Sequence, residues 1–461
     1  MQFTRTGSQA SYLSLLVVLF LLFTLTSCEL FENDRDQPVL NLTGVTAPFP
    51  CEDGLADGTF PCQGIDMFSH VPNDSLGGDR ANDIWGWVDP ITGRQYALVG
   101  LLDGTSIVDI TRPDSVVVTA KLNEPTFLTS GARSSKKYPG PQLKHDDNES
   151  DEGKEDSPWR DVKVYKNYLL VVSDAQPHGL QMFDLNRLRE INDAQTPAAL
   201  QADALYREFG NAHNIAVNTE TGFAYAVGTS GNTDTCGPNT SLHMIDLSDP
   251  LNPSRAGCYE DTNLGNVIRA GYVHDTQCVI YKGTDEDYAG KEICFNSSES
   301  NFSITDVNDK SAPATISFTS YPGNQYAHQG WLTEDHTYFL LNDELNETRT
   351  GSATTTHIFD VSDLDNPIHL GEFEHETFSI DHNLYVRRNL VFQSNYTSGL
   401  RVFETNNLED GKLNLRAYFD THPENDAVVF DGSWSNYPFF DNGIVVVSDI
   451  SNGLFVLSDP R

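Results

Sequence analysis

The 461-residue chain has few basic residues: 29 Lys and Arg stand against 66 Asp and Glu, which gives a formal net charge of −37. Proteins that bind nucleic acid use clustered Lys and Arg to displace the counterions of the phosphates, so this chain is not expected to bind nucleic acid. The same shortage disfavours direct contact with anionic lipid surfaces. Cations, sugars and basic proteins remain as classes of partner.

Familiar catalytic motifs are also missing. The sequence has no GxSxG nucleophile elbow, no P-loop and no GxGxxG after a strand. His375-Glu376 begins like an HExxH zinc motif, but Ser379 stands where the second His is required. The sequence therefore leaves open whether the protein is an enzyme.

Long hydrophobic runs are rare, and the clearest one lies near the N-terminus at residues 13–25 (LSLLVVLFLLFTL). Since about 20 residues are needed to cross a bilayer, this run fits the core of a signal peptide better than a membrane span. It ends in Thr26-Ser27-Cys28, which resembles the lipobox of bacterial lipoproteins. We predict a signal peptide over residues 1–27, lipidation at Cys28 and an acidic, Pro-containing tether over residues 28–50. The alternative is an ordinary signal peptide with an unmodified Cys.

Cysteine is sparse, and its count fits this prediction. Seven Cys residues less Cys28 leave an even number, and short spacings favour three local disulfides in an oxidising compartment. The expected pairs are Cys51 with Cys62, Cys236 with Cys258, and Cys278 with Cys294. We expect an exported lipoprotein of the outer membrane or cell surface, on its extracellular or periplasmic face.

One short pattern recurs seven times along the chain. A run of apolar residues is followed by Asp, an apolar residue and then Ser, Thr or Asn, and the last two copies are degenerate. An Asp in this place accepts hydrogen bonds from the main chain two residues on, so each is expected to cap a turn. The five that keep this form are Asp109, Asp184, Asp246, Asp306 and Asp360.

Two more apolar strands precede each copy, which predicts units of about 54 residues with four short strands each, as in β-propellers. We therefore predict an all-β fold over residues 51–461, a seven-bladed β-propeller of four-stranded antiparallel blades. The last unit lacks a fourth strand, and residues 64–71 are expected to supply it and close the ring. Rings of six or eight blades are the alternatives.

Two segments depart from the strand pattern. Residues 186–191 and 198–206 are the pieces expected to form helix. Residues 133–158 form an insertion that includes the acidic run DDNESDEGKED, whose like charges repel one another and predict a disordered surface loop. A cation site there is the alternative, although no EF-hand pattern is present.

The repeats carry a family resemblance. The Asp-apolar-Ser-Asp-Pro copies resemble LVIVD repeats, and the motifs NDIWGW, WRDVKVY, AHNIAVN, HDTQCV, HQGWLTED and DHNLYV are similar to the choice-of-anchor B family of secreted bacterial proteins. The resemblance runs from Cys51 to Arg461 and implies a secreted propeller, here anchored through Cys28. It implies no established reaction, and the acidic insertion departs from it.

A ring of polar residues marks the start of each first strand. Because first strands of propeller blades line the central channel, these residues are expected at one rim of the channel. Four imidazoles and two carboxylates there are an inventory of ligands for Zn, Mn, Fe or Ni, so a divalent metal is a candidate cofactor. The candidates are Asp83, Asp161, His213, His274, His328 and His382, with Ser433 in the last unit. Their neighbours Asn214, Asp275, Gln329, Asn383 and Trp434 are expected to support the ligands or bind a substrate.

The alternative role for these residues is structural, because polar groups at the mouth of an inner strand also hydrogen-bond to the next blade and fix its register. The sequence thus supports two functions. One is a monomeric, lipid-anchored binding or scaffold module for a protein or glycan, with surface Trp residues such as Trp85 and Trp331 as stacking partners. The other is a metal-dependent hydrolase or lyase that works at the His ring.

Overall fold

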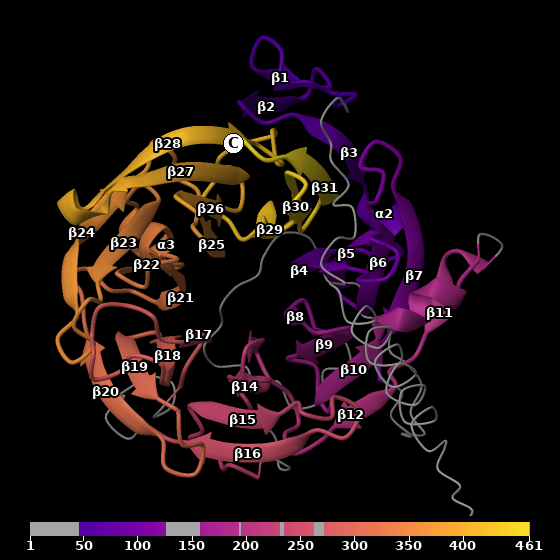
Figure 1. Ribbon diagram of the computed structural model, residues 1–461. Helices are drawn as coiled ribbons and strands as arrows, with labels where there is room; N and C mark the ends of the chain where they lie inside the picture. The colour runs from indigo at the N-terminus through magenta and orange to yellow at the C-terminus, as the bar shows by residue number, and fades with distance from the viewer. Residues whose placement is uncertain (1–45, 126–156, 193–194, 231–234, 262–271, 461) are drawn as a thin grey trace, which may run out of the picture.

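Seven sheets, each with four antiparallel blade strands, are arranged as a ring around a central axis (Figure 1). The computed structural model describes residues 46–125, 157–192, 195–230, 235–261 and 272–460. The predicted signal peptide, Cys28 and nearly all of the acidic insertion lie outside these residues. The ring confirms the predicted seven-bladed, all-β propeller.

The first four blades follow one another along the chain, each built outward from its innermost strand. Their strands are β4 (Ala81–Val88), β5 (Gln95–Leu101), β6 (Gly104–Asp109) and β7 (Val117–Asn123); β8 (Arg160–Tyr165), β9 (Tyr168–Ser173), β10 (Leu180–Asp184) and β12 (Ala204–Tyr206); β13 (Asn214–Asn218), β14 (Phe223–Val227), β15 (Leu242–Asp246) and β16 (Ser254–Tyr259); and β17 (Asp275–Ile280), β18 (Glu292–Ser297), β19 (Phe302–Asp306) and β20 (Ala314–Thr319).

The remaining three blades complete the ring. Their strands are β21 (Ala327–Leu332), β22 (Tyr338–Asp343), β23 (Thr355–Asp360) and β24 (Ile368–Glu374); β25 (Leu384–Arg387), β26 (Leu390–Ser394), β27 (Leu400–Asn407) and β28 (Lys412–Phe419); and β29 (Ser433–Tyr437), β30 (Ile444–Asp449) and β31 (Gly453–Ser458), joined by β3 (Met67–Val71).

Closure of the ring comes from the N-terminal side of the chain, as predicted. Strand β3 pairs antiparallel with β31, with Met67 opposite Leu457 and Val71 opposite Leu454. The seventh blade therefore joins two segments from opposite ends of the chain. This pairing covers the edge of β31, which would otherwise be left open to other strands.

Three additional strands lie at the edges of blades. The hairpin of β1 (Leu55–Ala56) and β2 (Phe60–Gln63) extends the sixth blade by pairing with β28. Strand β11 (Ala198–Leu200) runs parallel to β7 and extends the first blade. Within the described residues, helix is confined to short pieces: α2 (Asn73–Leu76), α3 (Asn346–Thr350), and the 3₁₀ helices η1 (Leu185–Glu190) and η3 (Leu408–Asp410).

The predicted helix over residues 198–206 is wrong. Residues 198–200 form β11 and residues 204–206 form β12, the outer strand of the second blade. The segment is rich in Ala and Leu, which favour helix, but the exposed edges of two neighbouring blades offer unpaired main-chain groups. Pairing with those edges outweighs a propensity difference of a few tenths of a kcal/mol per residue. Residues 186–191 are largely helical, as η1.

The Asp of each repeat caps a turn, as predicted. In all five copies one carboxylate oxygen accepts a hydrogen bond from the main-chain N–H two residues later, over 2.7 to 2.9 Å. The donors are the amides of Thr111, Asn186, Ser248, Asn308 and Ser362. The recurring acid therefore has a local structural function at the same corner of five blades.

Apolar clusters fill the spaces between adjacent blades. One cluster, for example, joins Leu98 and Ile107 of the first blade to Leu169 and Val171 of the second. The three expected disulfides are present, between Cys51 and Cys62, Cys236 and Cys258, and Cys278 and Cys294. They are consistent with an exported protein. None of the helices in the described parts of the chain is long and apolar enough to cross a membrane.

Candidate functional site

Four histidines lie side by side at one end of the central channel. They mark the starts of the first strands of the third to sixth blades. His213 directly precedes β13, His274 directly precedes β17, His328 lies in β21, and His382 lies two residues before β25. The ring centroids are 4.5 Å apart for His213 and His274, 4.2 Å for His274 and His328, and 4.4 Å for His328 and His382. The structure thus assembles the four predicted imidazoles into one arc.

Hydrogen bonds fix the orientation of three of these rings. Nδ1 of His274 donates to the main-chain carbonyl of His328 over 2.9 Å, and Nδ1 of His382 donates to the carbonyl of Trp434 over 2.5 Å. Nδ1 of His213 bonds to a carboxylate oxygen of Asp174 over 2.8 Å. Because a carbonyl only accepts, the neutral rings of His274 and His382 carry their proton on Nδ1 and keep a lone pair on Nε2.

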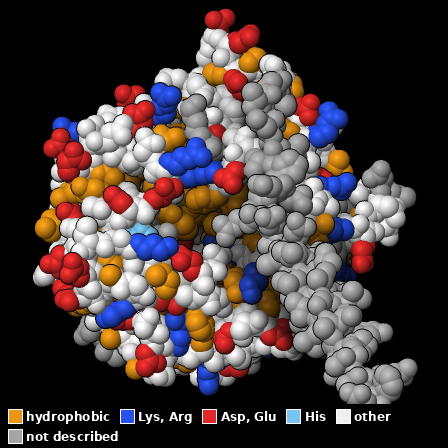
Figure 2. All heavy atoms as spheres, in the orientation of Figure 1, with side chains coloured by type: hydrophobic (Ala, Val, Ile, Leu, Met, Phe, Trp, Pro, Cys, Tyr) orange, Lys and Arg blue, Asp and Glu red, His pale blue; other side chains and the backbone are white. Residues whose placement is uncertain are grey.

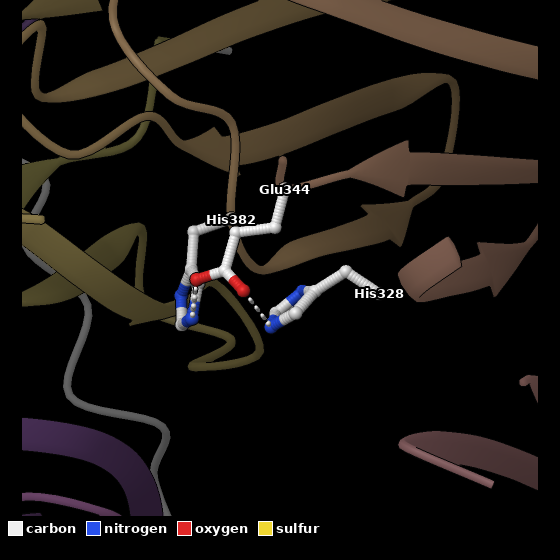
Figure 3. A group of neighbouring side chains, drawn as sticks. All are labelled: His328, Glu344 and His382. Carbon is white, nitrogen blue, oxygen red and sulfur yellow. Dashed lines mark ion pairs between the residues drawn. The ribbon is translucent and has the colours of Figure 1, made fainter. Parts of the chain in front are cut away.

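Glu344 places a carboxylate between two of the rings (Figure 3). It follows β22 directly, and its two oxygens lie 3.6 Å from Nε2 of His328 and 3.6 Å from Nε2 of His382. The hydroxyl of Tyr396 donates to one of these oxygens over 2.7 Å. The three potential ligand atoms all lie within 4.8 Å of one another, and all three side chains are buried.

These groups face a small cavity of about 20 Å³. A space of this size holds one water molecule or one ion. Its lining includes all four histidines and Glu344, together with Asp83, Trp159, Arg160, Asn214, Asn383 and Trp434.

Burial governs the protonation of the arc. It lowers the pKa of His274 well below the ordinary value, and the neighbouring His328 and His213 lower it further. Burial also lowers the pKa of His382, against the opposing effect of Glu344. Burial acts on His213 in the same way, but the Asp174 carboxylate and more distant acids outweigh it and leave the pKa of His213 raised.

The two candidate aspartates hold blades in register. Oδ2 of Asp83 accepts from the Val162 amide of the next blade over 3.0 Å. Asp161 makes the same contact one blade on, accepting from the Ile215 amide over 2.6 Å. Both carboxylates also contact the ammonium group of Lys163, which lies 3.1 Å from Asp83. Asp83 lines the small cavity, whereas Asp161 is not among the residues that line it.

Burial raises the pKa of Asp83 to about 7, and the neighbouring Asp161 adds to this rise while Lys163 opposes it. The contacts of both aspartates with the next blade fit the alternative role given above, in which polar residues fix the register between blades.

The expected supporting residues divide between two ends of the channel. Asn214, Asn383 and Trp434 line the small cavity, and the Asn214 amide donates to the His274 carbonyl over 2.9 Å. Asp275 and Gln329 instead line a larger cavity at the opposite end. Gln329 accepts from the Leu384 amide over 2.9 Å, so it too joins neighbouring blades.

Sequence reasoning missed Glu344 and Asp174 as members of the arc. Each is the first residue after the second strand of its blade, β22 and β9 respectively. Because second strands run antiparallel to first strands, they end at the rim where first strands begin. An acidic residue directly after a second strand was therefore the feature that predicted a side chain beside the histidines, and the repeat pattern showed where second strands end.

No protein-family model matches the chain, and no curated protein matches it either. Many solved structures match the chain. One is the β-propeller domain of Cps50 (Swd1) from Myceliophteria thermophila, with 12% identity, a TM-score of 0.49, and coverage of 86% of this chain and 99% of that one. Another is a protein from Lactobacillus plantarum, with 13% identity, a TM-score of 0.46, and coverage of 77% and 84%. Such identities assign no ligand or activity to this chain.

Proposed function

We propose that the protein is an exported, lipid-anchored β-propeller whose channel binds one divalent transition-metal ion through His328, Glu344 and His382. The observation that carries this proposal is the Glu344 carboxylate, whose oxygens lie 3.6 Å from the Nε2 atoms of both histidines. Two ligand atoms that are each about 2.1 Å from one ion lie about 3.4 Å apart at the tetrahedral angle. The Glu344 carboxylate is therefore spaced from each histidine as two ligands of one ion are, and the three ligand atoms lie within 4.8 Å of one another.

The chemistry of the contact supports a cation. With its proton on Nδ1, His382 turns the lone pair of Nε2 toward a carboxylate oxygen, so that two acceptors face each other. A positive ion between them replaces this repulsion with two bonds. Two imidazoles and a carboxylate suit Zn, Mn, Fe and Ni, whereas Ca and Mg prefer sites built from oxygen atoms.

The main-chain carbonyls behind His274 and His382 also match a metal site. Ligating histidines commonly donate their second ring nitrogen to a carbonyl or carboxylate, which fixes the ring and the tautomer. Here His274, His382 and His213 each do so. His274 stands next to His328 and is the nearest candidate for a fourth ligand.

Calorimetric titration of the chelator-treated mature protein with ZnCl₂, in the presence of CaCl₂ and MgCl₂, tests the proposal. We expect one zinc ion per chain. The double variant His328→Ala/His382→Ala should weaken zinc binding at least 100-fold, and the isosteric Glu344→Gln variant should weaken it at least 10-fold with an unchanged circular dichroism spectrum.

Two control variants separate this site from adventitious binding. His369→Ala removes a half-buried histidine outside the channel, and Asp365→Asn disrupts an exposed cluster with Asp285 and Asp363. Both should bind zinc as the unaltered protein does. Zinc that stays bound to the double variant, or is lost from Asp365→Asn, would contradict the proposal.

A metal-dependent hydrolase is the second candidate, because two histidines and one glutamate are also the donor set of hydrolytic zinc enzymes. Turnover of p-nitrophenyl acetate by zinc-loaded protein, lost in Glu344→Gln, would favour it over binding alone. Equal background turnover by the loaded protein and the variant would reject it.

Export and anchoring rest on the N-terminal pattern, the resemblance to secreted choice-of-anchor B proteins with LVIVD repeats, and the three disulfides. In bacterial cells, the protein should partition with detergent and carry labelled palmitate. The Cys28→Ala variant should lose both properties, and retention of the label would place the lipid elsewhere or exclude it.

A further inference from the structure

The opposite end of the channel holds a second cavity of about 550 Å³. The inner strands that begin at the histidine arc finish here. The lining follows these strands along the channel, from early residues such as Asp275 to late residues such as Trp331 and the loops that follow. The volume lies within the range of about 300–1,000 Å³ that sites for small organic ligands occupy. This cavity has no part in the proposed metal site.

Six aromatic side chains line one part of this cavity, and Figure 2 shows hydrophobic side chains gathered at the centre of one face of the ring. The rings come from four consecutive blades, the fifth, sixth, seventh and first, and pack edge to face at centroid distances that include 5.0 Å for Trp331 and Tyr385 and 5.0 Å for Trp85 and Tyr437. This aromatic wall consists of Trp331, Tyr385, Tyr437, Phe439, Trp85 and Trp87. Tyr385 and Trp87 are buried, and the other four are half-buried.

A glycine shapes this wall. A Cβ atom at Gly86 would lie 2.2 Å from the ring of Tyr437, so only the absence of a side chain lets Tyr437 pack against β4. The backbone at Gly86 lies outside the left-handed region, and space is the whole constraint. The position of Tyr437 in the wall therefore depends on residue 86.

The side of the cavity that comes from the third and fourth blades carries both polar and apolar side chains. The polar ones are Asn218, Thr219, Glu220, Asp275, Thr276 and Gln277, and Ile215, Ala216, Val217, Cys278 and Val279 lie among them. The Gln277 amide oxygen accepts from the Leu332 amide over 2.8 Å, while its NH₂ group bonds to none of the described residues. Asp275 accepts from the Thr276 amide over 2.6 Å. Hydrogen-bond donors and acceptors therefore line the same cavity as the aromatic rings.

The charges of the lining balance. Lys163 and Lys166 stand against Glu220 and Asp275. Lys163 is further held by Asp83 and Asp161, and its ammonium lies 4.8 Å from the centre of the Trp85 ring. The cavity therefore offers no excess positive charge to an anionic ligand.

We propose that this cavity binds a neutral sugar, up to a disaccharide in size, with its apolar face on Trp331 and Trp85 and its hydroxyl groups toward Asp275 and Gln277. A pyranose ring has a face of C–H groups that packs on aromatic rings and an edge of hydroxyls that donate and accept. A disaccharide needs roughly 300 Å³, which the cavity provides. The assignment stands independently of the metal site.

Saturation-transfer NMR and calorimetry with cellobiose, maltose, lactose and N,N′-diacetylchitobiose test the proposal on the mature protein. We expect at least one of these sugars to bind at millimolar or tighter affinity. Trp331→Ala and the isosteric Asp275→Asn should each weaken that binding at least 10-fold. Phe318→Ala, which removes an exposed aromatic side chain far from the channel end, should leave it unchanged.

Three further outcomes support or overturn the sugar site. The His328→Ala/His382→Ala variant should bind the sugar normally, which separates this site from the metal site. Binding of tetramethylammonium with none of the four sugars would make the cavity a site for cations and overturn the proposal. Sugar binding that persists in both Trp331→Ala and Asp275→Asn would also overturn it.

Discussion

The two ends of the channel are built on the same seven inner strands but differ in almost every property. At one end, buried imidazoles and a carboxylate enclose about 20 Å³. At the other, mostly half-buried aromatic rings and a wall of polar and apolar side chains enclose about 550 Å³. Between them lies the Lys163 ammonium with Asp83 and Asp161. One scaffold therefore presents a narrow polar site and a wide amphipathic site on the same axis.

The two ends differ because the residues at the strand starts repeat from blade to blade, whereas the residues further along the strands do not. Four first strands begin with the same residue type, so the narrow end inherits a regular arc of histidines. Further along those strands the residues differ between blades, as with Trp331 in the fifth and Gln277 in the fourth. Variation between blades thus makes the wide cavity two-sided.

Removing the ammonium between the two ends should have the largest effect. Lys163→Met leaves Asp83 and Asp161 buried without their cation, and breaking a buried ion pair in this way costs about 3–5 kcal/mol. Urea denaturation should show this loss. Adding Asp83→Asn and Asp161→Asn should restore most of it, and a triple variant as unstable as Lys163→Met would show that packing of Lys163 is the cause.

Acid should destabilise the narrow end through His178. Burial and the neighbouring Arg160 lower the pKa of His178 to about 3, so the folded protein binds fewer protons than the unfolded chain below pH 6.5. Stability is full above pH 6.5 and is lost as pH falls toward 3, by about 3 kcal/mol between pH 7 and pH 4. Denaturation at several pH values should show this slope. A slope unchanged in His178→Gln would assign it to other groups.

At the wide end, Gly86→Ala should cost about 1–3 kcal/mol, because the new methyl group overlaps the Tyr437 ring. The displaced ring should also weaken sugar binding while zinc binding at the opposite end stays unchanged. Thermal melting and the two titrations check both parts. An equal loss of zinc affinity would mean that the two ends are coupled.

The smallest effect is expected outside the channel. Asp360→Ala removes a turn cap and should cost about 1 kcal/mol without altering either ligand. A change in zinc or sugar affinity in this variant would contradict the assignment of the two ligands to the two ends of the channel.

The sequence allowed the propeller, its closure and the histidine arc to be predicted because each depends on repeated or terminal features. The turn aspartates and the strand starts recur at fixed places, and an unpaired last strand calls for a partner from residues 64–71. Glu344 and Asp174 were missed because the repeat was aligned on first-strand starts and turn aspartates, whereas these two acids follow second strands. The aromatic wall could not be predicted, since its six rings come from four blades and meet only in the folded protein. The strands at residues 198–206 were missed because β11 pairs with β7 of the first blade and β12 with β10 of the second, and neither pairing can be read from the local sequence.

The N-terminal hairpin has a mechanical consequence. Any pull on the chain before residue 46 acts first on Phe49, which is hydrogen-bonded to Met67 of β3, and then on Cys51. The disulfide from Cys51 to Cys62 carries the force past β1 and β2 along covalent bonds. The load then arrives at β3, which lies along β31 and is bonded to it side by side. Such a pair must shear as a whole, whereas a hairpin opens one bond at a time. A protein tethered by its N-terminus would therefore resist tension at the seam where its ring is closed.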